Sequence, residues 1–238
     1  MIAVIDPRMP CSAKAKLKEI CEVVELPPFS ALDSRVASHP DMLIFELGEK
    51  LFVSKDYYKE AKNEIDIITK AASLSLKLTN DTLGKNYPDD IKFNAFRIGN
   101  FLVGNSEYIS NDLKHYSNHL GIKEATVKQG YAKCSTVVLK DAVISADKGI
   151  CDGVRAIGFD ELQISSDGVL LNGYGCGFIG GASGVWEDKL FFCGDITAHK
   201  DYESISAFCT AHRYEVISLS SEPLYDVGTI YFFSNKRG

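Results

Sequence analysis

The sequence predicts a single-domain α/β fold in which five similar units close into a ring. A hairpin of two apolar strands joined by a short polar turn recurs along the chain, most clearly over Ser135–Ala146. Its copies lie roughly 40–50 residues apart, a period typical of repeat architectures. The chain opens on an apolar strand, Ile2–Ile5, that lacks the first half of its hairpin. It ends on another, Ile230–Phe233, that lacks the second half.

Each hairpin is followed by a helix and a third strand. Complete hairpins are expected at residues 42–54, 94–104, 135–146 and 182–193. Helices are expected at 12–20, 55–72, 111–120, 151–157 and 201–212, where apolar residues recur at helical spacing or a capping residue comes first. Third strands are expected at 22–26, 73–78, 124–127, 161–164 and 215–219, where the patterns are short and β-like.

The two terminal strands are expected to pair with each other. Pairing Ile230–Phe233 with Ile2–Ile5 completes the fifth unit and closes the ring. An apolar strand left unpaired at an edge would invite aggregation, so closure also has a physical motive. One domain covering residues 1–238 is therefore expected.

Composition narrows the class of protein. The net charge of −6 argues against nucleic acid or an anionic membrane as a partner, since both favour a basic face. No stretch approaches the roughly 18 apolar residues of a membrane span, and the first residues lack the basic region of a signal peptide. The seven cysteines are scattered without a Cys-x-x-Cys pair, which indicates reduced thiols and a cytoplasmic location.

Four motifs carry a family resemblance, namely Ser38–Asp41, Val127–Ser135, Gly177–Ser183 and Pro223–Gly228. They resemble a small bacterial family of uncharacterised pentein-like proteins. The five-unit pattern resembles the pentein fold, also called the guanidino-group modifying enzyme fold, with five strand–strand–helix–strand blades around a pseudo-fivefold axis. That fold includes arginine deiminases, dimethylarginine hydrolases, amidinotransferases and the ribosome anti-association factor six.

The resemblance implies where a site lies. In penteins, the residues just before each hairpin face a central channel. The corresponding positions here are His39 and Asp41, Lys92 and Asn94, Lys133 to Ser135, Gly180 to Ser183, and Asp226. We therefore expect a pocket at the channel mouth for a small polar ligand, amino-acid-like or guanidino in type.

The sequence departs from the enzymes of that fold at three places. The amidino-hydrolysing members use a cysteine in the last unit, a histidine opening the third hairpin and an acid near the second. Here the last unit has Asp226 and Thr229 but no cysteine, the third hairpin opens with Cys134, and the second has Asn94. The usual catalytic set is therefore missing.

Whether the protein is an enzyme stays open at this point. If it is a hydrolase or amidinotransferase acting on C–N bonds, Cys134 is the expected nucleophile, with Asp41 and Asp226 orienting the substrate. Lys133 beside Cys134 would lower the thiol pKa if both point inward. The alternatives are a buried structural thiol at Cys134 and Asx turn caps at the two acids.

The remaining expected ligand-binding residues are His39, Asn94, Lys133, Ser135, Gly180, Gly181 and Ser183. His39 is equally compatible with a simple loop position before a proline. An alternative function of another class is a non-catalytic pentein that binds a protein or ribosomal partner through one face of the disc.

No cofactor or metal is expected. Gly175–Gly180 matches Gly-x-Gly-x-x-Gly, but a hairpin-like run follows it where a dinucleotide fingerprint needs a helix. His115 and His119 lie one helical turn apart, yet no third ligand is evident, which favours a solvated helix face. Arg8 and Lys92 could bind a substrate carboxylate, although surface charge is the simpler interpretation.

Overall fold

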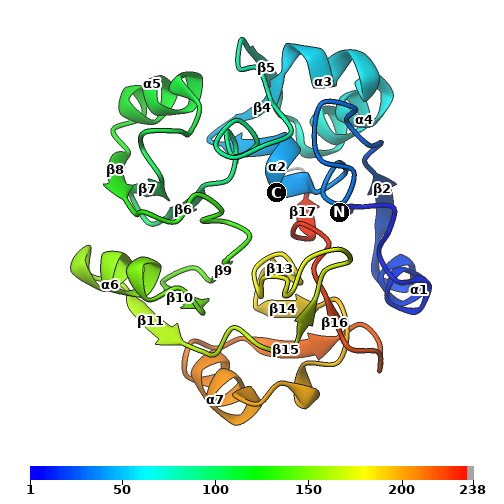
Figure 1. Cartoon of the computed structure of the whole chain (residues 1–238), viewed down its shortest axis with the longest axis vertical. Coiled ribbons are helices and arrows are strands. Elements are labelled where there is room, and N and C mark those ends of the chain that lie inside the picture. The colour runs from blue at the N-terminus through cyan, green and yellow to red at the C-terminus, as the bar shows by residue number, and fades with distance from the viewer. Residues whose placement is uncertain (235–238) are drawn as a thin grey trace.

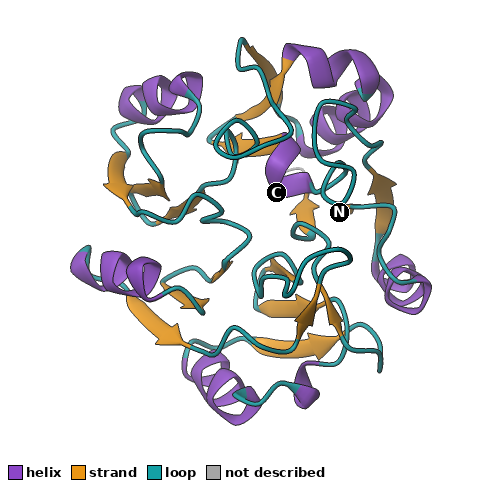
Figure 2. Cartoon of the chain, viewed as in Figure 1, coloured by secondary structure: helices purple, strands orange, loops and turns teal. Residues whose placement is uncertain are grey.

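The computed structural model describes residues 1–234. These residues form five three-stranded sheets and one two-stranded pair. In each three-stranded sheet, the middle strand pairs antiparallel with one neighbour and parallel with the other. The longer helices lie at the outside of the molecule and the sheets lie inside them, whereas one short helix over Pro40–Leu43 lies near the centre (Figures 1 and 2).

The two ends of the chain meet in one sheet. Its elements are β1 (Ile2–Ile5), α1 (Cys11–Ile20), β2 (Glu22–Glu25) and β17 (Tyr231–Phe233). β17 runs antiparallel to β1 with Phe233 opposite Ile2, and β2 runs parallel to β1 on the other side. β1 is therefore a central strand rather than an edge, as its fully buried apolar sequence requires.

The second and third units follow the predicted order of hairpin, helix and third strand. The second comprises β3 (Ile44–Leu47), β4 (Lys50–Ser54), α3 (Lys55–Glu60), α4 (Lys62–Ala72) and β5 (Ser75–Thr79). The third comprises β6 (Phe96–Ile98), β7 (Phe101–Gly104), α5 (Asn111–His119) and β8 (Lys123–Thr126). A short helix, α2 (Pro40–Leu43), precedes β3 and was not predicted.

The fourth and fifth units have the same order. The fourth comprises β9 (Thr136–Val138), β10 (Ala142–Ser145), α6 (Lys148–Ala156) and β11 (Asp160–Gln163). The fifth comprises β13 (Ser183–Trp186), β14 (Lys189–Phe192), the 3-10 turn η1 (Ile196–Ala198), α7 (Tyr202–Ala211) and β15 (Glu215–Ser218). β12 (Val169–Leu170), which follows the fourth unit, and β16 (Leu224–Tyr225), which follows the fifth, form a parallel pair that was also not predicted.

Two helix predictions need correction. The helix expected over 55–72 is broken at Ala61, whose φ of −115° and ψ of 26° leave helical geometry, and Tyr57 and Ile65 on either side are both fully buried. The helix expected over 151–157 begins at Lys148, because the Asp147 side chain accepts a hydrogen bond from Ile150 N and caps it.

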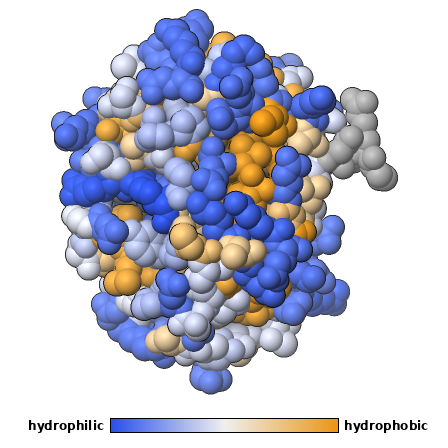
Figure 3. All heavy atoms as spheres, turned by 90° about the vertical axis from the view of Figure 1, so that its right-hand side faces the viewer, coloured by the Kyte–Doolittle hydropathy of each residue, from blue (hydrophilic) through white to orange (hydrophobic). Residues whose placement is uncertain are grey.

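The core lies between each sheet and its outer helix. Leu17 of α1, Leu113 of α5 and Val154 of α6 are fully buried. Each such side chain contributes about 1.5–3 kcal/mol through burial. Polar and apolar side chains are interspersed on the side of the molecule drawn in Figure 3.

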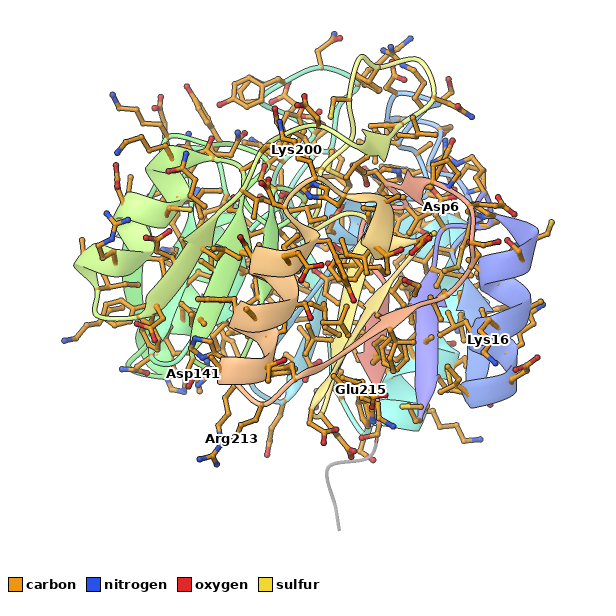
Figure 4. All side chains as sticks on the ribbon, turned by 90° about the horizontal axis from the view of Figure 1, so that it is seen from below. Asp6, Lys16, Asp141, Lys200, Arg213 and Glu215 are labelled. Atoms are coloured by element: carbon orange, nitrogen blue, oxygen red, sulfur yellow. The ribbon has the colours of Figure 1, made fainter. Side chains whose placement is uncertain are left out.

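The molecule has two faces that differ in their connections. Seen from below, Asp6 and Lys200 lie toward one face and Asp141, Arg213 and Glu215 toward the other (Figure 4). Asp6 directly follows β1, whereas Asp141 lies in the turn of the β9–β10 hairpin. We call the first the Asp6 face. The polar residues described below belong to segments that lead into the hairpins or leave them.

Within residues 1–234, no helix is long and apolar enough to cross a membrane. All seven cysteines lie within this range and carry free thiols.

Candidate functional site

Segments that each lead into a strand are joined by hydrogen bonds near the centre of the molecule. They are His39–Asp41 before β3, Asn94 before β6, Lys133–Ser135 before β9, and Asp226–Thr229 before β17. These are positions at which the family resemblance implied a site. Their side chains are almost all buried.

The first segment is shaped by a proline and a distant glycine. Pro40 is the first residue of α2, where the missing N–H has no helical partner to lose. Asp41 N donates to Gly228 O at 3.0 Å, which joins this turn to the last segment. Gly228 has a φ of 66°, and a Cβ there would lie 2.2 Å from His39 Cβ. The close approach of the two segments therefore requires glycine.

Cys134 is held by side chains from two other units. Its Sγ donates to Asp41 Oδ2 at 3.0 Å, and Asn94 Nδ2 donates to Sγ at 3.0 Å. Asn94 Oδ1 accepts from the backbone N–H groups of Lys133 and Cys134, at 2.8 and 3.2 Å. Asn94 thus fixes both the backbone and the sulfur of Cys134.

A chain of hydrogen bonds leads from Lys133 to the thiol. Lys133 Nζ donates to Thr229 Oγ1 at 3.1 Å, and Thr229 Oγ1 is 2.9 Å from Asp41 Oδ2, to which it donates. Cys134 donates to the same carboxylate oxygen. Asp41 Oδ1 is buried with no hydrogen-bond partner in the described chain. We call Asp41, Asn94, Lys133, Cys134 and Thr229 the Cys134 cluster.

Asp226 holds two backbone segments. Its Oδ2 accepts from Phe178 N at 2.8 Å and its Oδ1 accepts from Gly228 N at 3.0 Å. His39 lies between two acids without bonding to either, since its Nδ1 is 3.9 Å from Asp226 Oδ1 and its Nε2 is 3.8 Å from Asp6 Oδ2. His39 Nδ1 is also without a hydrogen-bond partner in the described residues.

Burial governs the protonation of the site. Burial raises the pKa of Cys134 well above its usual value, and the nearby Asp41 and Asp226 raise it further, so the resting form is the thiol. Burial also raises the pKa values of Asp41 and Asp226. Lys133 does not bond to the sulfur, because its ammonium donates to Thr136 O and Thr229 instead. The expected lowering of the thiol pKa by Lys133 is therefore not observed.

Burial has the opposite effect on the basic groups. It lowers the pKa of His39, against the attraction of Asp226 and Asp6. It also lowers the pKa of Lys133, against the attraction of Asp41. Burial therefore favours the uncharged forms of His39 and Lys133 more than exposure to solvent would.

The burial of Asp41 predicts a pH effect on stability. Because the folded-state pKa lies above the usual 3.8, the stability present below pH 3.8 is lost as the pH rises through the folded pKa. Asp41→Asn cannot ionise, so its free energy of unfolding should increase relative to the parent as the pH rises from about 4 toward 7. Urea unfolding of both proteins across this range measures the difference. A constant difference would mean that Asp41 does not titrate abnormally.

A cavity of about 170 Å³ adjoins the cluster, and we call it the Cys134 cavity. Its lining is formed by Val36, His39, Met42, Asp90, Tyr131, Cys134, Leu171, Tyr174, Cys176, Phe178 and Asp226. Asp90 Oδ2 accepts from the Tyr131 hydroxyl at 2.7 Å, whereas Asp90 Oδ1 is buried with no partner among the described residues. Burial raises the pKa of Asp90, although the bond from Tyr131 opposes this.

The predicted site residues are distributed around this cavity. His39, Cys134 and Asp226 line it, and Asp41, Asn94 and Lys133 support Cys134 from behind. Gly180 and Gly181 pack closely against backbone and Asp226, and Ser183 Oγ donates to Gly180 O at 3.0 Å. Ser135 faces a different cavity. A ligand-binding role for the glycines and serines stays a prediction.

Several residues of the site were missed by the sequence reasoning. Asp90 ends a loop rich in Asn, Asp and Pro, and Tyr131 lies in the motif that precedes the third hairpin. A polar loop immediately before a hairpin was the available signal for both. Thr229 lies one residue beyond the Pro223–Gly228 motif, and no signal in the sequence marked it as part of the site. Arg8 and Lys92, the two basic residues considered for binding a substrate carboxylate, both lie beside acids of the chain. Arg8 Nε donates to Asp6, and Lys92 Nζ lies 3.8 Å from Asp89 Oδ1.

Metal binding has no support in the described chain. Within residues 1–234, no group of three or more His, Cys, Asp or Glu side chains is arranged to hold a metal ion. His115 and His119 lie on α5, apart from the Cys134 cluster.

Comparison with known proteins places this arrangement in a family. A family model matches residues 4–231. The chain belongs to the family described as "Family of unknown function (DUF6873)". No protein of curated function matches this DUF6873 chain in sequence.

Solved structures show which fold this DUF6873 member has. It is similar to DDAH from Pseudomonas aeruginosa, a cysteine-to-serine variant in complex with citrulline, with a TM-score of 0.54, 10% identity, and 92% and 91% of the two chains covered. It is similar to C. jejuni agmatine deiminase, a cysteine-to-serine variant with substrate bound, with a TM-score of 0.56, 9% identity, and 92% and 87% covered. An amidinotransferase from Microseira wollei gives a TM-score of 0.52 with 12% identity, covering 92% of this chain and 88% of that one.

These similarities are at the level of the fold. They confirm the predicted resemblance to the fold of these guanidino-group modifying enzymes, since nearly the whole chain is covered in each comparison. At about one identical residue in ten, they do not transfer any residue's role.

Proposed function

We propose that the Cys134 cavity binds a small cationic compound of the guanidino or amino-acid-like class. We also interpret the chain as a single pentein domain, with the five three-stranded sheets as blades and the β1–β17 pairing as the closure of the ring. In this interpretation, the segments before the hairpins line one mouth of the central channel. The buried site and the fold are then parts of one arrangement.

The observation that carries the proposal is the unpartnered carboxylate oxygen of Asp90 in the cavity wall. A buried carboxylate without a partner is costly, and a ligand cation supplies the missing donor and charge. Asp226 adds a second carboxylate to the same lining. The described residues that line this cavity include no lysine or arginine, and the nearby Arg35 guanidinium lies over the Tyr174 ring, 4.1 Å from its centroid.

Aromatic rings complete a surface suited to a flat cation. Tyr131 and Phe178 are stacked with ring centroids 6.1 Å apart and an interplanar angle of 29°, and Tyr174 also lines the cavity. Aromatic faces attract cations, and a guanidinium plane stacks well on them. Carboxylates paired with aromatic rings therefore favour a guanidinium over a neutral or anionic ligand.

Cys134 supplies a nucleophile, so this site can carry out a reaction on the cation that it binds. In a hydrolysis, Sγ bonds to the guanidinium carbon while the thiol proton passes to Asp41 Oδ2, which already accepts it at 3.0 Å. One C–N bond then breaks, the leaving amine takes up a proton, and water releases the ureido product from sulfur. The arrival of a cation beside Cys134 lowers its raised thiol pKa and so favours this step.

Thermal shift measurements with matched ligands test the binding. Agmatine and L-arginine should raise the melting temperature, whereas L-citrulline, which has an uncharged ureido group, should not. Asp90→Asn should weaken binding of the cations at least about tenfold, because it removes a buried charge-assisted hydrogen bond. Asp188→Asn removes an exposed acid from the β13–β14 turn and is the matched control.

Product analysis tests the reaction separately. Cys134→Ala should retain cation binding and lose release of ammonia or amine from the bound compound. If turnover persists in Cys134→Ala, the thiol step is wrong while the binding site stands. If neither cation binds the parent protein, the proposal fails, and a non-catalytic role in binding a protein partner becomes the better candidate.

A further inference from the structure

A second cavity adjoins the first on the Asp6 face, and we call it the His199 cavity. Its volume is about 210 Å³. Its lining is formed by Gln129, Ser135, Ala146, Asp147, Ser165, Ser166, Val169, Cys176, Gly177, Phe178, Ile179 and His199. Lys200, the next residue after His199, lies toward the same face as Asp6 in Figure 4.

One short segment separates the two cavities. Cys176 and Phe178 line both of them, so the 176–178 segment is their shared wall. Consecutive residues of the turn before β9 lie on either side, since Cys134 lines the first cavity and Ser135 lines the second. The His199 cavity is thus distinct from the site proposed above, although it shares a wall with it.

His199 presents an unused donor to this cavity. Its Nδ1 accepts a hydrogen bond from Asp201 N at 3.1 Å, which places the proton of the neutral ring on Nε2. His199 is 5% exposed, and its Nε2 has no hydrogen-bond partner in the described chain. A buried donor of this kind is costly to leave unsatisfied, and an acceptor that reaches it removes that cost.

Ser135 presents a second unused group to the same cavity. Its side chain is 3% exposed, and its Oγ also lacks a hydrogen-bond partner within residues 1–234. His199 Nε2 and Ser135 Oγ therefore do not bond to each other. One acceptor atom between them, or two atoms of one polar group, would satisfy both.

The charges around the cavity limit the kind of ligand. Asp147 is the one acid in the lining, and both of its oxygens are in use, by Ile150 N at 2.9 Å and Gln129 Nε2 at 3.0 Å. Among the described lining residues there is no lysine or arginine. An anion would therefore lack a counter-charge, and a cation would meet the His199 donor instead of a free carboxylate.

We infer that the His199 cavity is a second binding site for a small neutral molecule. Its carbonyl oxygen accepts one hydrogen bond from His199 Nε2 and a second from the Ser135 hydroxyl. Primary amides and ureido groups have this chemistry, because one carbonyl oxygen accepts two hydrogen bonds. The volume of about 210 Å³ is well above the roughly 10–15 Å³ that a single water molecule needs. A group of a few heavy atoms fits within it.

Three probes of one shape and different charge test this inference. Acetamide is neutral, acetate is its anionic analogue and acetamidinium is its cationic analogue. In an NMR titration of the ring ¹⁵N signals, acetamide should shift the His199 signals saturably, and the two charged probes should bind at least about tenfold more weakly there. His199→Gln assigns the signals by removing them.

A variant adds a second readout. Ser135→Ala should weaken acetamide binding about fivefold, through loss of one hydrogen bond. Asp188→Asn, in the β13–β14 turn and outside the lining of both cavities, should leave it unchanged. The titration of the parent protein needs no variant, so its result stands even if Ser135→Ala does not fold.

The outcomes that overturn the inference are distinct from failure of the cation site. Acetate binding as tightly as acetamide, unchanged affinity in Ser135→Ala, or no saturable shift well above millimolar acetamide would each overturn it. The last result would mean that the cavity holds only water. Acetamidinium that perturbs Tyr131 and Tyr174, which line only the Cys134 cavity, but not His199 would support the Cys134 cavity alone.

Discussion

Gly180→Ala is expected to lower the free energy of unfolding by about 3 kcal/mol. A Cβ at this position would lie 2.4 Å from Thr136 O, 2.5 Å from Lys133 O and 2.5 Å from Thr136 N. All three are backbone atoms, which cannot rotate away as a side chain can. Overpacking costs typically 1–3 kcal/mol and more when the surroundings are rigid, so the upper end applies.

The same substitution should damage the site as well as the fold. Gly180 O accepts a hydrogen bond from Ser183 Oγ at 3.0 Å, and at 3.2 Å from Thr229 Oγ1 it shares that hydroxyl's one proton with Asp41. Moving this segment away from Lys133 displaces Thr229, which also bonds to Asp41. We therefore expect the variant to lose binding of guanidino cations even under conditions in which it is still folded.

Gly175→Ala is the matched control in the same glycine-rich segment. No described atom lies within 4 Å of the position that its Cβ would take. Its cost should lie within about 0.5 kcal/mol of zero, and a small gain is expected from the less flexible unfolded chain. Urea unfolding at pH 7 measures all three proteins. Equal midpoints for Gly175→Ala and Gly180→Ala would contradict the prediction, because they would show that the backbone around Gly180 moves to accommodate a methyl group without loss of stability.

The sequence was sufficient for the order of most elements and for bringing three of the candidate residues together. Hairpin spacing and the two unmatched terminal strands predicted the sheets, and β1 does pair with β17. The resemblance placed His39, Cys134 and Asp226 in one region, and these residues line one cavity. Both successes depend on regular features, namely a repeated pattern and a fixed position before each hairpin.

What the sequence did not reveal depends on irregular backbone. Asp90 is held at the cavity by the hydrogen bond that its side chain accepts from the Tyr131 hydroxyl. No periodic pattern in the sequence predicts such a bond. The division into two cavities depends on the course of Cys176–Phe178, a loop without helix or strand. The raised pKa of Cys134 also depends on tertiary packing, because Asp41 and Asp226, which raise it further, come from other segments of the chain.

Asp226→Asn is expected to destabilise the protein by about 2 kcal/mol, although Asp41→Asn is not. Both acids are fully buried, but their bonding differs. The two oxygens of Asp226 accept from two backbone donors, Phe178 N and Gly228 N. Asparagine keeps one acceptor oxygen, so its NH₂ group must face one of these N–H groups and leave it unsatisfied. That costs about 1–3 kcal/mol.

At Asp41 the same change is tolerated by the geometry. Asp41 Oδ2 accepts from both Cys134 and Thr229, whereas Oδ1 has no partner in the described chain. Asparagine can retain the accepting oxygen and place its NH₂ where the unpartnered oxygen was, and it no longer carries a charge that burial disfavours. At pH 7 we expect its unfolding midpoint to equal or exceed that of the parent.

The contrast between these two substitutions also bears on the cavity. Loss of the bond to Phe178 N frees a segment that forms the wall between both cavities, so Asp226→Asn should weaken the binding of cations by at least about tenfold. Urea unfolding and ligand titration of the two variants at pH 7 measure both effects. Equal stability losses in the two variants would mean that burial alone, rather than the pairing of Asp226 with two backbone N–H groups, determines what these acids contribute.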